Sequence, residues 1–208
     1  MAWHLLANFS QIGVISSLAG HSAAATQGAC HNFAINWISL MNEDPTATAE
    51  KSRKRMTQLS KGKGGGNPVL QAAYSRRWKA GDYQKADEMM IAIRGLQEKG
   101  MAIDYSAFNL PKFKEAVSTS PEYSGIIYSF WFAGSVVGAS GGGHSIGFYR
   151  ELIARRGLLI KDTDYTICFD PNFGEMYIPD AEFNSFYGWI VSAYGAFQLQ
   201  MAKGVEMK

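Results

Sequence analysis

Short runs of β-branched and aromatic residues in the second half of the chain constrain its fold more than any other feature. Gly, Pro and Asp separate these runs, and these residues are typical of turns. Strands that follow one another so closely are most easily joined as antiparallel neighbours, so we expect an antiparallel sheet. The runs cover residues 124–132, 145–150, 165–169 and 175–178.

The first half of the chain carries helix signals instead. Asp44-Pro45 and Asn67-Pro68 each place a capping residue before a proline, which fits the first position of a helix. Asp82 follows the helix breaker Gly81 and is a third capping residue, and Gly100 is a stop signal. The expected helices cover approximately residues 29–41, 44–60, 67–79, 82–99 and 113–117, and one more follows Pro179-Asp180.

The order of these elements predicts the fold class. Helices that precede a sheet along the chain are typical of α+β proteins. A chain of 208 residues can bury a full core, so we expect a single domain that spans residues 1–208. Within it we expect a helical part at about residues 23–120 and a sheet part at about residues 121–208.

Charge and hydropathy exclude several classes of protein. Twenty basic residues stand against eighteen acidic ones, and a net charge of +2 gives no field that would favour nucleic acid. No run of about eighteen apolar residues occurs, so we expect no membrane span. The N-terminal residues lack the basic segment of a secretory signal, and export would therefore need a non-classical route.

Four basic residues cluster on the helix expected at residues 44–60. They are Lys51, Arg53, Lys54 and Arg55. A cluster of this size is usually a solvated helix face, and this is our interpretation, with the docking of a partner as the alternative.

Cys30 stands at the start of an expected helix, directly after Gly28-Ala29. Phe33, Trp37 and Leu40 recur at helical spacing, which supports the helix. A thiol in the first turn feels the unpaired backbone N–H groups there, and these favour the reactive thiolate. Cys30 is therefore a candidate nucleophile, and a small buried apolar residue is the alternative.

Candidate partners for this thiol lie far downstream. His144 follows three glycines at the entry to an expected strand, and Asp170 ends another. Thiol acyl transfer needs these groups, because an imidazole moves the proton and a carboxylate orients the imidazole. A structural histidine and a turn-forming aspartate are the alternatives. Asn172 would orient the imidazole if Asp170 points away from it. We expect the site in the groove between the cysteine helix and the sheet.

No chemical role is expected for the other cysteine and the other histidines. Cys168 lies two residues before Asp170 on an expected strand, hence on the same side of it, and we interpret it as a buried core thiol. His4, His21 and His31 do not recur at the spacing of zinc ligands. We therefore expect no metal and no cofactor.

Three blocks of the sequence resemble the YopT-type bacterial effector cysteine proteases, a branch of the papain-like enzymes. The blocks are Gly-Ala-Cys-His-Asn-Phe at residues 28–33, Gly-Gly-His-Ser at residues 142–145 and Phe-Asp-Pro-Asn-Phe-Gly-Glu at residues 169–175. The last block is the most specific. The region between about Glu43 and Glu122 does not take part in the resemblance.

The resemblance implies a papain-like fold and a cysteine-type endopeptidase. Cys30 would be the nucleophile, His144 the general base and acid, and Asp170 the orienting carboxylate. Papain-like enzymes usually place Gln or Asn about five or six residues before the cysteine as an oxyanion donor, whereas this chain has alanine at both positions. Gln27 is the nearest candidate for that donor.

The family further implies a secreted virulence effector that cuts selected proteins in the cytoplasm of a host cell. Its partner would be a protein substrate and not nucleic acid, and we expect a monomer. The segment between Glu43 and Glu122 would then supply specificity.

Other functions remain open on the same residues. A glutamine deamidase or transglutaminase toxin would apply the same acyl-enzyme chemistry to a side-chain amide. A peptidoglycan amidase toxin is a further possibility on this scaffold. A non-catalytic binding module is the alternative from another class, and it predicts that Cys30→Ala retains biological activity.

Overall fold

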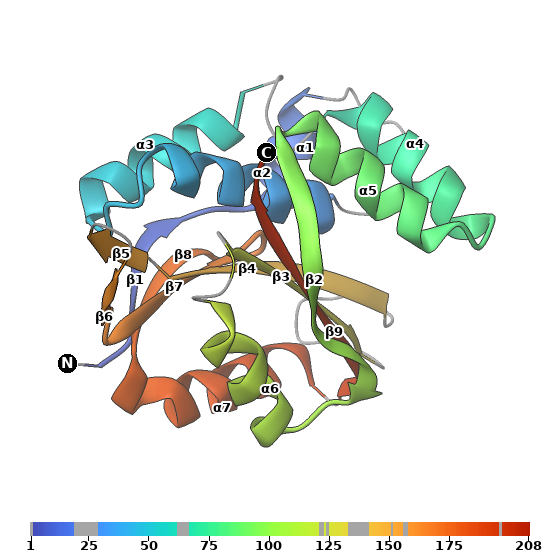
Figure 1. The fold of residues 1–208 in the computed structure, drawn as a ribbon. Helices are drawn as coiled ribbons and strands as arrows, with labels where there is room; N and C mark the ends of the chain where they lie inside the picture. Colours follow the sequence, from blue (N-terminus) through green and yellow to red (C-terminus); the bar gives the residue numbers. More distant parts are fainter. Residues whose placement is uncertain are drawn as a thin grey trace.

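A sheet runs between two layers of helices (Figure 1). The computed structural model describes residues 2–18, 29–61, 67–120, 123, 125–132, 142–150, 152–155, 158–195 and 197–208. Above the sheet lie α1 (Gln11–Leu18), α2 (Cys30–Glu43), α3 (Ala49–Leu59), α4 (Pro68–Lys79) and α5 (Tyr83–Ile93). Below it lie α6 (Leu110–Ser118) and α7 (Phe183–Tyr194), the latter preceded by the 3-10 turn η3 (Asp180–Glu182).

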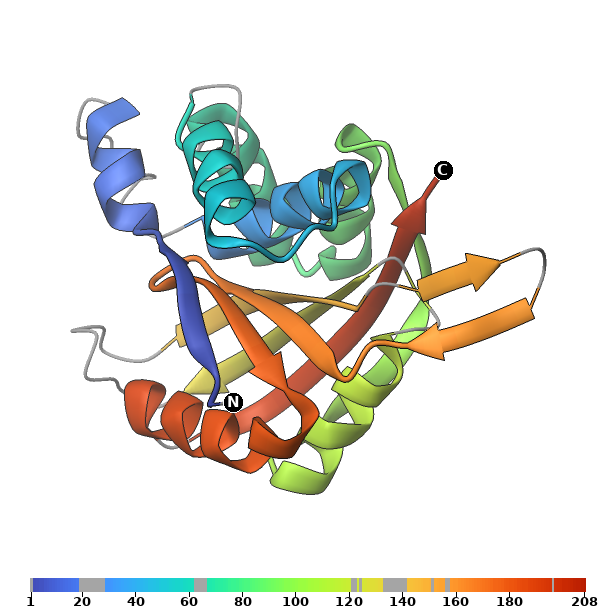
Figure 2. The same ribbon diagram turned by 90° about the vertical axis from the view of Figure 1, so that its left-hand side faces the viewer.

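The main sheet has the strand order β1-β8-β7-β4-β3-β9-β2, and neighbours are antiparallel at every pairing of the described strands. Its strands are β1 (His4–Asn8), β2 (Leu96–Ala107), β3 (Gly125–Phe132), β4 (Gly142–Tyr149), β7 (Tyr165–Asp170), β8 (Gly174–Pro179) and β9 (Phe197–Met207). A separate hairpin of β5 (Leu152–Arg155) and β6 (Leu158–Asp162) projects from the body of the molecule (Figure 2). The α+β class and the antiparallel sheet are confirmed.

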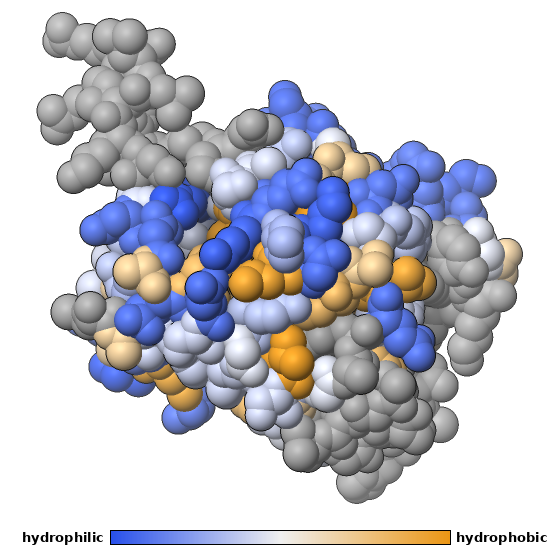
Figure 3. Space-filling model, turned by 90° about the horizontal axis from the view of Figure 1, so that it is seen from below, coloured by the Kyte–Doolittle hydropathy of each residue, from blue (hydrophilic) through white to orange (hydrophobic). Residues whose placement is uncertain are grey.

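Alternation of side chains along the strands gives the sheet an apolar core on each face. The upper core lies under α2 and includes Trp37 and Phe169, whose rings stack at 5.6 Å. The lower core lies over α6 and α7 and includes Phe113, Phe148 and Phe186. Seen from below, hydrophilic residues are interspersed with small hydrophobic areas (Figure 3). Cys168 is fully buried in the lower core, as predicted.

Glycines beneath α2 allow this helix to lie close to the sheet. A Cβ atom at Gly147 on β4 would lie 2.7 Å from the ring of Trp37, and one at Gly125 on β3 would lie 2.9 Å from Ile38. Both distances are shorter than van der Waals contact, so any side chain at either position would push the helix away from the sheet.

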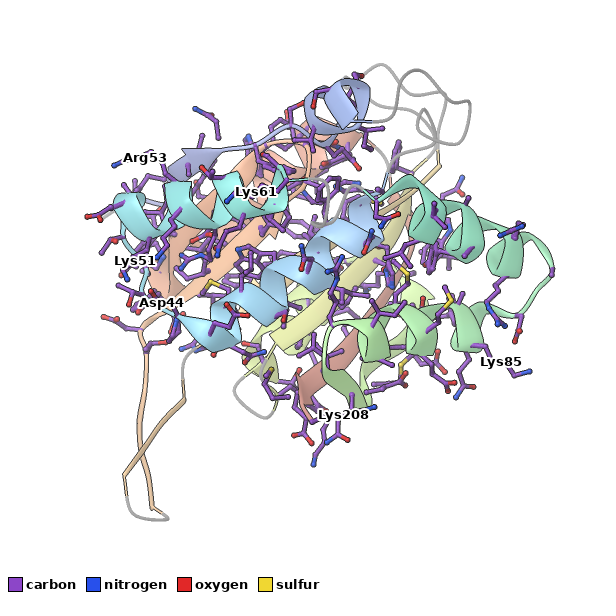
Figure 4. All side chains as sticks on the ribbon, turned by 90° about the horizontal axis from the view of Figure 1, so that it is seen from above. Asp44, Lys51, Arg53, Lys61, Lys85 and Lys208 are labelled. Atoms are coloured by element: carbon purple, nitrogen blue, oxygen red, sulfur yellow. The ribbon has the colours of Figure 1, made fainter. Side chains whose placement is uncertain are left out.

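The capping signals of the first half are correct for α4 and wrong for α3. Asn67 accepts the backbone N–H of Val69 at 3.0 Å, and α4 begins at Pro68 as predicted. α3 begins later than Asp44-Pro45 predicted, with Thr48 as its N-cap. The backbone N–H of Asp44 bonds the last turn of α2, and its carboxylate pairs with Lys51 at 2.6 Å, so Asp44 ends one helix and does not open the next (Figure 4).

The helix expected over residues 82–99 is wrong in its last part. α5 ends at Ile93, and Gly95 turns the chain with a φ of +69°, a backbone conformation that favours glycine. From Leu96 the chain becomes β2, which pairs with β9 at one edge of the sheet, while β1 pairs with β8 at the other edge. Residues upstream of 121 thus supply both edge strands.

None of the described helices combines the length and the hydrophobicity that crossing a membrane requires.

Candidate active site

Cys30 is the first residue of α2, as the sequence predicted, and its side chain is half-buried. Its sulfur atom receives hydrogen bonds from the backbone N–H groups of His31 and Ser145 and from the imidazole of His144. The N–H of Ala29, just before it, donates to Oε1 of Gln11 at 2.9 Å. The thiol therefore lies at a helix N-terminus where N–H donors converge, and such donors stabilise a thiolate.

His144 lies near the start of β4, and Asp170 lies at the end of β7. Nε2 of His144 is 2.9 Å from Oδ1 of Asp170, and both side chains are almost completely buried. Cys30, His144 and Asp170, which are separated by more than a hundred residues of sequence at the widest, thus meet at one end of the sheet.

The electrostatics of the thiol and the imidazole favour an ion pair. Burial alone would raise the pKa of Cys30, but the charge and hydrogen bond of His144 and the neighbouring N–H groups hold this pKa below its usual value. Burial alone would lower the pKa of His144, but the charges of Asp170 and Cys30 raise it to about 10. Between these two pKa values, Cys30 is a thiolate and His144 is an imidazolium.

Tyr194, at the end of α7, completes the environment of the carboxylate. Its hydroxyl group donates to Oδ2 of Asp170 at 2.7 Å, accepts from Nδ2 of Asn172 at 3.0 Å, and lies 2.9 Å from Nε2 of His144. Its ring stacks on the imidazole at 4.9 Å. Oδ1 of Asp170 also accepts the backbone N–H of Asn172 at 2.8 Å. The buried carboxylate is thereby held in one orientation, as a buried charge requires.

Gln11 connects the end of the site at Cys30 to the end at Asp170 and Tyr194. Its Oε1 accepts the N–H of Ala29, and its Nε2 donates to Oδ1 of Asn172 at 2.6 Å. Nδ2 of Asn172 in turn donates to the hydroxyl group of Tyr194. Only 5% of Gln11 is exposed. It lies in the first turn of α1, where its own backbone N–H donates to the carbonyl of Pro171 at 2.7 Å.

The structure brings Cys30, His144 and Asp170 together, while their catalytic roles remain a proposal. Asp170 faces the imidazole, so Asn172 is not needed as a substitute for it. Gln27, the predicted oxyanion donor, lies outside the described residues.

Sequence reasoning missed Gln11 and Tyr194. Tyr194 lies on the helix that the sequence predicts after Pro179-Asp180, and a buried tyrosine hydroxyl usually has a partner, but the pattern does not show which one. Gln11 has no local signal, because its partners lie on other elements.

Cys168 provides an internal control for thiol reactivity. Burial, with the nearby charges of Asp170 and Glu175, raises its pKa well above the usual value. We expect a disulfide reagent such as DTNB at pH 8 to modify one thiol rapidly in the native protein and the second only after denaturation. Cys30→Ala should abolish the rapid phase, and two rapid equivalents in the parent protein would contradict the buried position of Cys168.

Among the described residues, no group of three or more His, Cys, Asp or Glu side chains is arranged to hold a metal ion.

Comparison with solved structures identifies the fold. The crystal structure of the Pseudomonas avirulence protein AvrPphB matches with a TM-score of 0.53 and 14% sequence identity, over 93% of this chain and 100% of that one. At this identity the similarity establishes the fold alone. The resemblance drawn from the sequence motifs is thus confirmed at the level of the fold that the two proteins share. A scan against protein-family models and a search of curated proteins found no match.

Proposed function

We propose that this chain is a cysteine protease that cleaves selected proteins of a host cell. The observation that carries the proposal is the hydrogen-bonded pair of Cys30 and His144, with Asp170 at 2.9 Å from the far nitrogen of the imidazole. The papain-like fold supports it, and the similarity to an avirulence protein supports a role as an effector delivered into host cells.

The first half of the reaction forms an acyl-enzyme. The Cys30 thiolate attacks the carbonyl carbon of the scissile peptide bond, and the carbonyl oxygen becomes an oxyanion that the backbone N–H of Cys30 stabilises. The N–H of Ala29 is already bonded to Gln11 and is not available for this purpose. The His144 imidazolium then donates its proton to the leaving amine, the C–N bond breaks, and a thioester remains on Cys30.

The second half releases the product. Neutral His144 takes a proton from a water molecule, whose oxygen attacks the thioester, and collapse of the intermediate expels the thiolate and restores the ion pair. Asp170 and Tyr194 occupy the Nε2 side of the imidazole, which leaves Nδ1 for exchange with Cys30 and the substrate. Their role is to fix the orientation of the ring through both steps.

The proposal is tested by a search for new protein N-termini. A eukaryotic cell lysate is incubated with the parent protein or with Cys30→Ala, and free N-termini are labelled and identified by mass spectrometry. We expect a small set of new N-termini that share a local sequence, present with the parent and with Cys168→Ala and absent with Cys30→Ala.

Other outcomes point to the alternative functions. Glutamine residues that gain about one mass unit without backbone cleavage would indicate a deamidase, which uses the same acyl-enzyme. If the parent and Cys30→Ala give the same peptides throughout, the protease proposal is wrong for these proteins. A biological effect that Cys30→Ala retains would favour a binding module.

A further inference from the structure

A second buried polar network lies directly beside Cys30 and His144, and the proposed reaction does not use it. Its members carry polar or charged groups, yet each is less than a tenth exposed. They are His31, Asp87, Ser129, Ser145 and Lys203. Burial of such groups costs free energy unless they bond one another, so their contacts are informative about what the network holds in place.

One end of the network joins the helix of the nucleophile to the strand of the base. Nδ1 of His31 on α2 lies 3.3 Å from Oγ of Ser145 on β4. Oγ of Ser145 lies 2.9 Å from Oγ of Ser129 on β3. His31 directly follows Cys30 in the chain, and Ser145 directly follows His144. The contact between His31 and Ser145 therefore crosses from helix to sheet one residue away from each reacting group.

The other end of the network fixes the ring of His31. Nε2 of His31 lies 3.2 Å from Oδ1 of Asp87 on α5, within the distance of an ion pair but without the alignment of a hydrogen bond. Tyr74 on α4 stacks on the ring at 4.8 Å with an interplanar angle of 18° and donates its hydroxyl group to the same carboxylate oxygen at 3.2 Å. Lys203 on β9 holds the second oxygen of Asp87 at 2.9 Å. Asp87 at one edge of the ring and Tyr74 on one face therefore hold it with Nδ1 toward Ser145.

The backbone of the same two residues holds the sulfur atom. The N–H groups of His31 and Ser145 both form hydrogen bonds with Cys30. One of these donors moves with α2 and the other with β4, so the thiolate is stabilised only while helix and strand keep their relative position. The side-chain contact between His31 and Ser145 links those two donors directly.

We propose that the hydrogen bond between His31 and Ser145 is a clasp that positions Cys30 against His144, with Asp87 and Ser129 holding its two ends. His31 and Ser145 are positioning residues in this arrangement, because they act through the residues that precede them. The inference rests on the proposed function, since it concerns the same pair of reacting groups.

The test compares the pH at which iodoacetamide begins to alkylate Cys30. Ser145→Ala removes the clasp and keeps the backbone N–H, and we expect the onset to move upward by about one pH unit, a tenfold change in equilibrium. We expect kcat/KM on a cleaved peptide to fall by about 10- to 100-fold, the usual cost of a small misplacement. Ser52→Ala is the control, because Ser52 is fully buried and its hydroxyl has no partner among the described residues.

A matched pair at His31 separates the clasp from a general structural role. Asn places a polar atom near the position of Nδ1, which faces Ser145, and Gln places one near the position of Nε2, which faces Asp87. Both substitutions lose the stacking on Tyr74 equally. We expect His31→Asn to retain the onset of the parent more closely than His31→Gln, although thermal unfolding of the two variants should be similar.

Each outcome decides between the two proposals. A parent protein whose Cys30 reacts as an ordinary thiol would overturn the proposed function. A low onset in the parent that Ser145→Ala leaves unchanged would overturn the clasp and leave the function standing. Should Ser145→Ala fail to fold by circular dichroism, the pair at His31 decides, and equal onsets for Asn and Gln would overturn the clasp.

Discussion

Replacing His144 with alanine is expected to raise the pH at which iodoacetamide alkylates Cys30 to about 8.5 or above, the range of an isolated thiol. In the parent protein His144 holds the pKa of Cys30 below its usual value, so alkylation should begin well below that pH. Protease activity should appear as Cys30 loses its proton and decline as pH passes about 10, where His144 loses its own. His144→Ala should lower turnover by about 10²–10⁴-fold, the usual contribution of acid–base catalysis.

His4 is the control for this experiment, because it is an exposed histidine on β1 whose ring stacks on Tyr177. His4→Ala should leave the onset of alkylation unchanged. If the parent protein reacts only near pH 8.5 and His144→Ala reacts in the same way, Cys30 is an ordinary thiol. The binding-module alternative would then describe the chain better than the protease.

A buried ion pair between Arg55 and Glu175 should give the largest effect on stability. Nε of Arg55 on α3 donates to Oε2 of Glu175 on β8 at 2.9 Å, and its NH2 group bonds Oε1. The indole N–H of Trp37 donates to the same carboxylate at 2.9 Å. Arg55 is 3% exposed and Glu175 is 0% exposed. Removing one partner leaves the other charge buried without its partner, which usually costs about 3–5 kcal/mol.

The substitution Arg55→Met keeps most of the apolar stem and removes the charge. We expect it to lower the free energy of unfolding by about 3–5 kcal/mol, and the melting temperature by about 6–20 °C for a chain of this size. Urea and thermal unfolding followed by circular dichroism provide the measurement. Glu175→Gln should destabilise as well, and combining it with Arg55→Met should cost less than the sum of the two.

Arg53 is the matched control, because it lies on the same helix and its side chain projects into solvent (Figure 4). Arg53→Met should change stability by no more than about 0.5 kcal/mol. An Arg55→Met variant as stable as Arg53→Met would show that the buried pair contributes little. The folded fraction of Arg55→Met should still show the alkylation profile of the parent, which separates stability from chemistry.

The three residues that we propose to react could be singled out from the sequence because each lies in a short block with local signals. Cys30 follows a glycine and opens a helix, His144 follows glycines at a strand, and Asp170 ends a strand before a proline. Arg55 shows the limit of such reasoning. It was interpreted with Lys51, Arg53 and Lys54 as part of an exposed face, but its partner Glu175 is 120 residues away and no local pattern reveals it.

The edge strand β2 could not be predicted from the sequence for a related reason. The pairing of β2 with β9 shifts register at several points, for example between Glu98 and Gly100, so apolar and polar residues do not alternate regularly along β2. Leu96 also lies at helical spacing from Met89 and Ile93. The sequence therefore predicts that the helix continues past Ile93. The turn at Gly95 was the available signal, and it lies only a few residues before the glycine that was taken as the helix stop.

Gly147 affects how precisely Cys30 and His144, the two groups that we propose to react, are positioned relative to each other. Trp37 rests on this glycine seven residues along α2 from Cys30, roughly 10 Å at the rise of an α-helix. A helix is stiff, so a small lift at Trp37 would be carried to its end as a tilt, and the sulfur atom would move relative to the imidazole. The alignment of thiol and base is thus adjusted from a distance, at a position that carries no side chain at all.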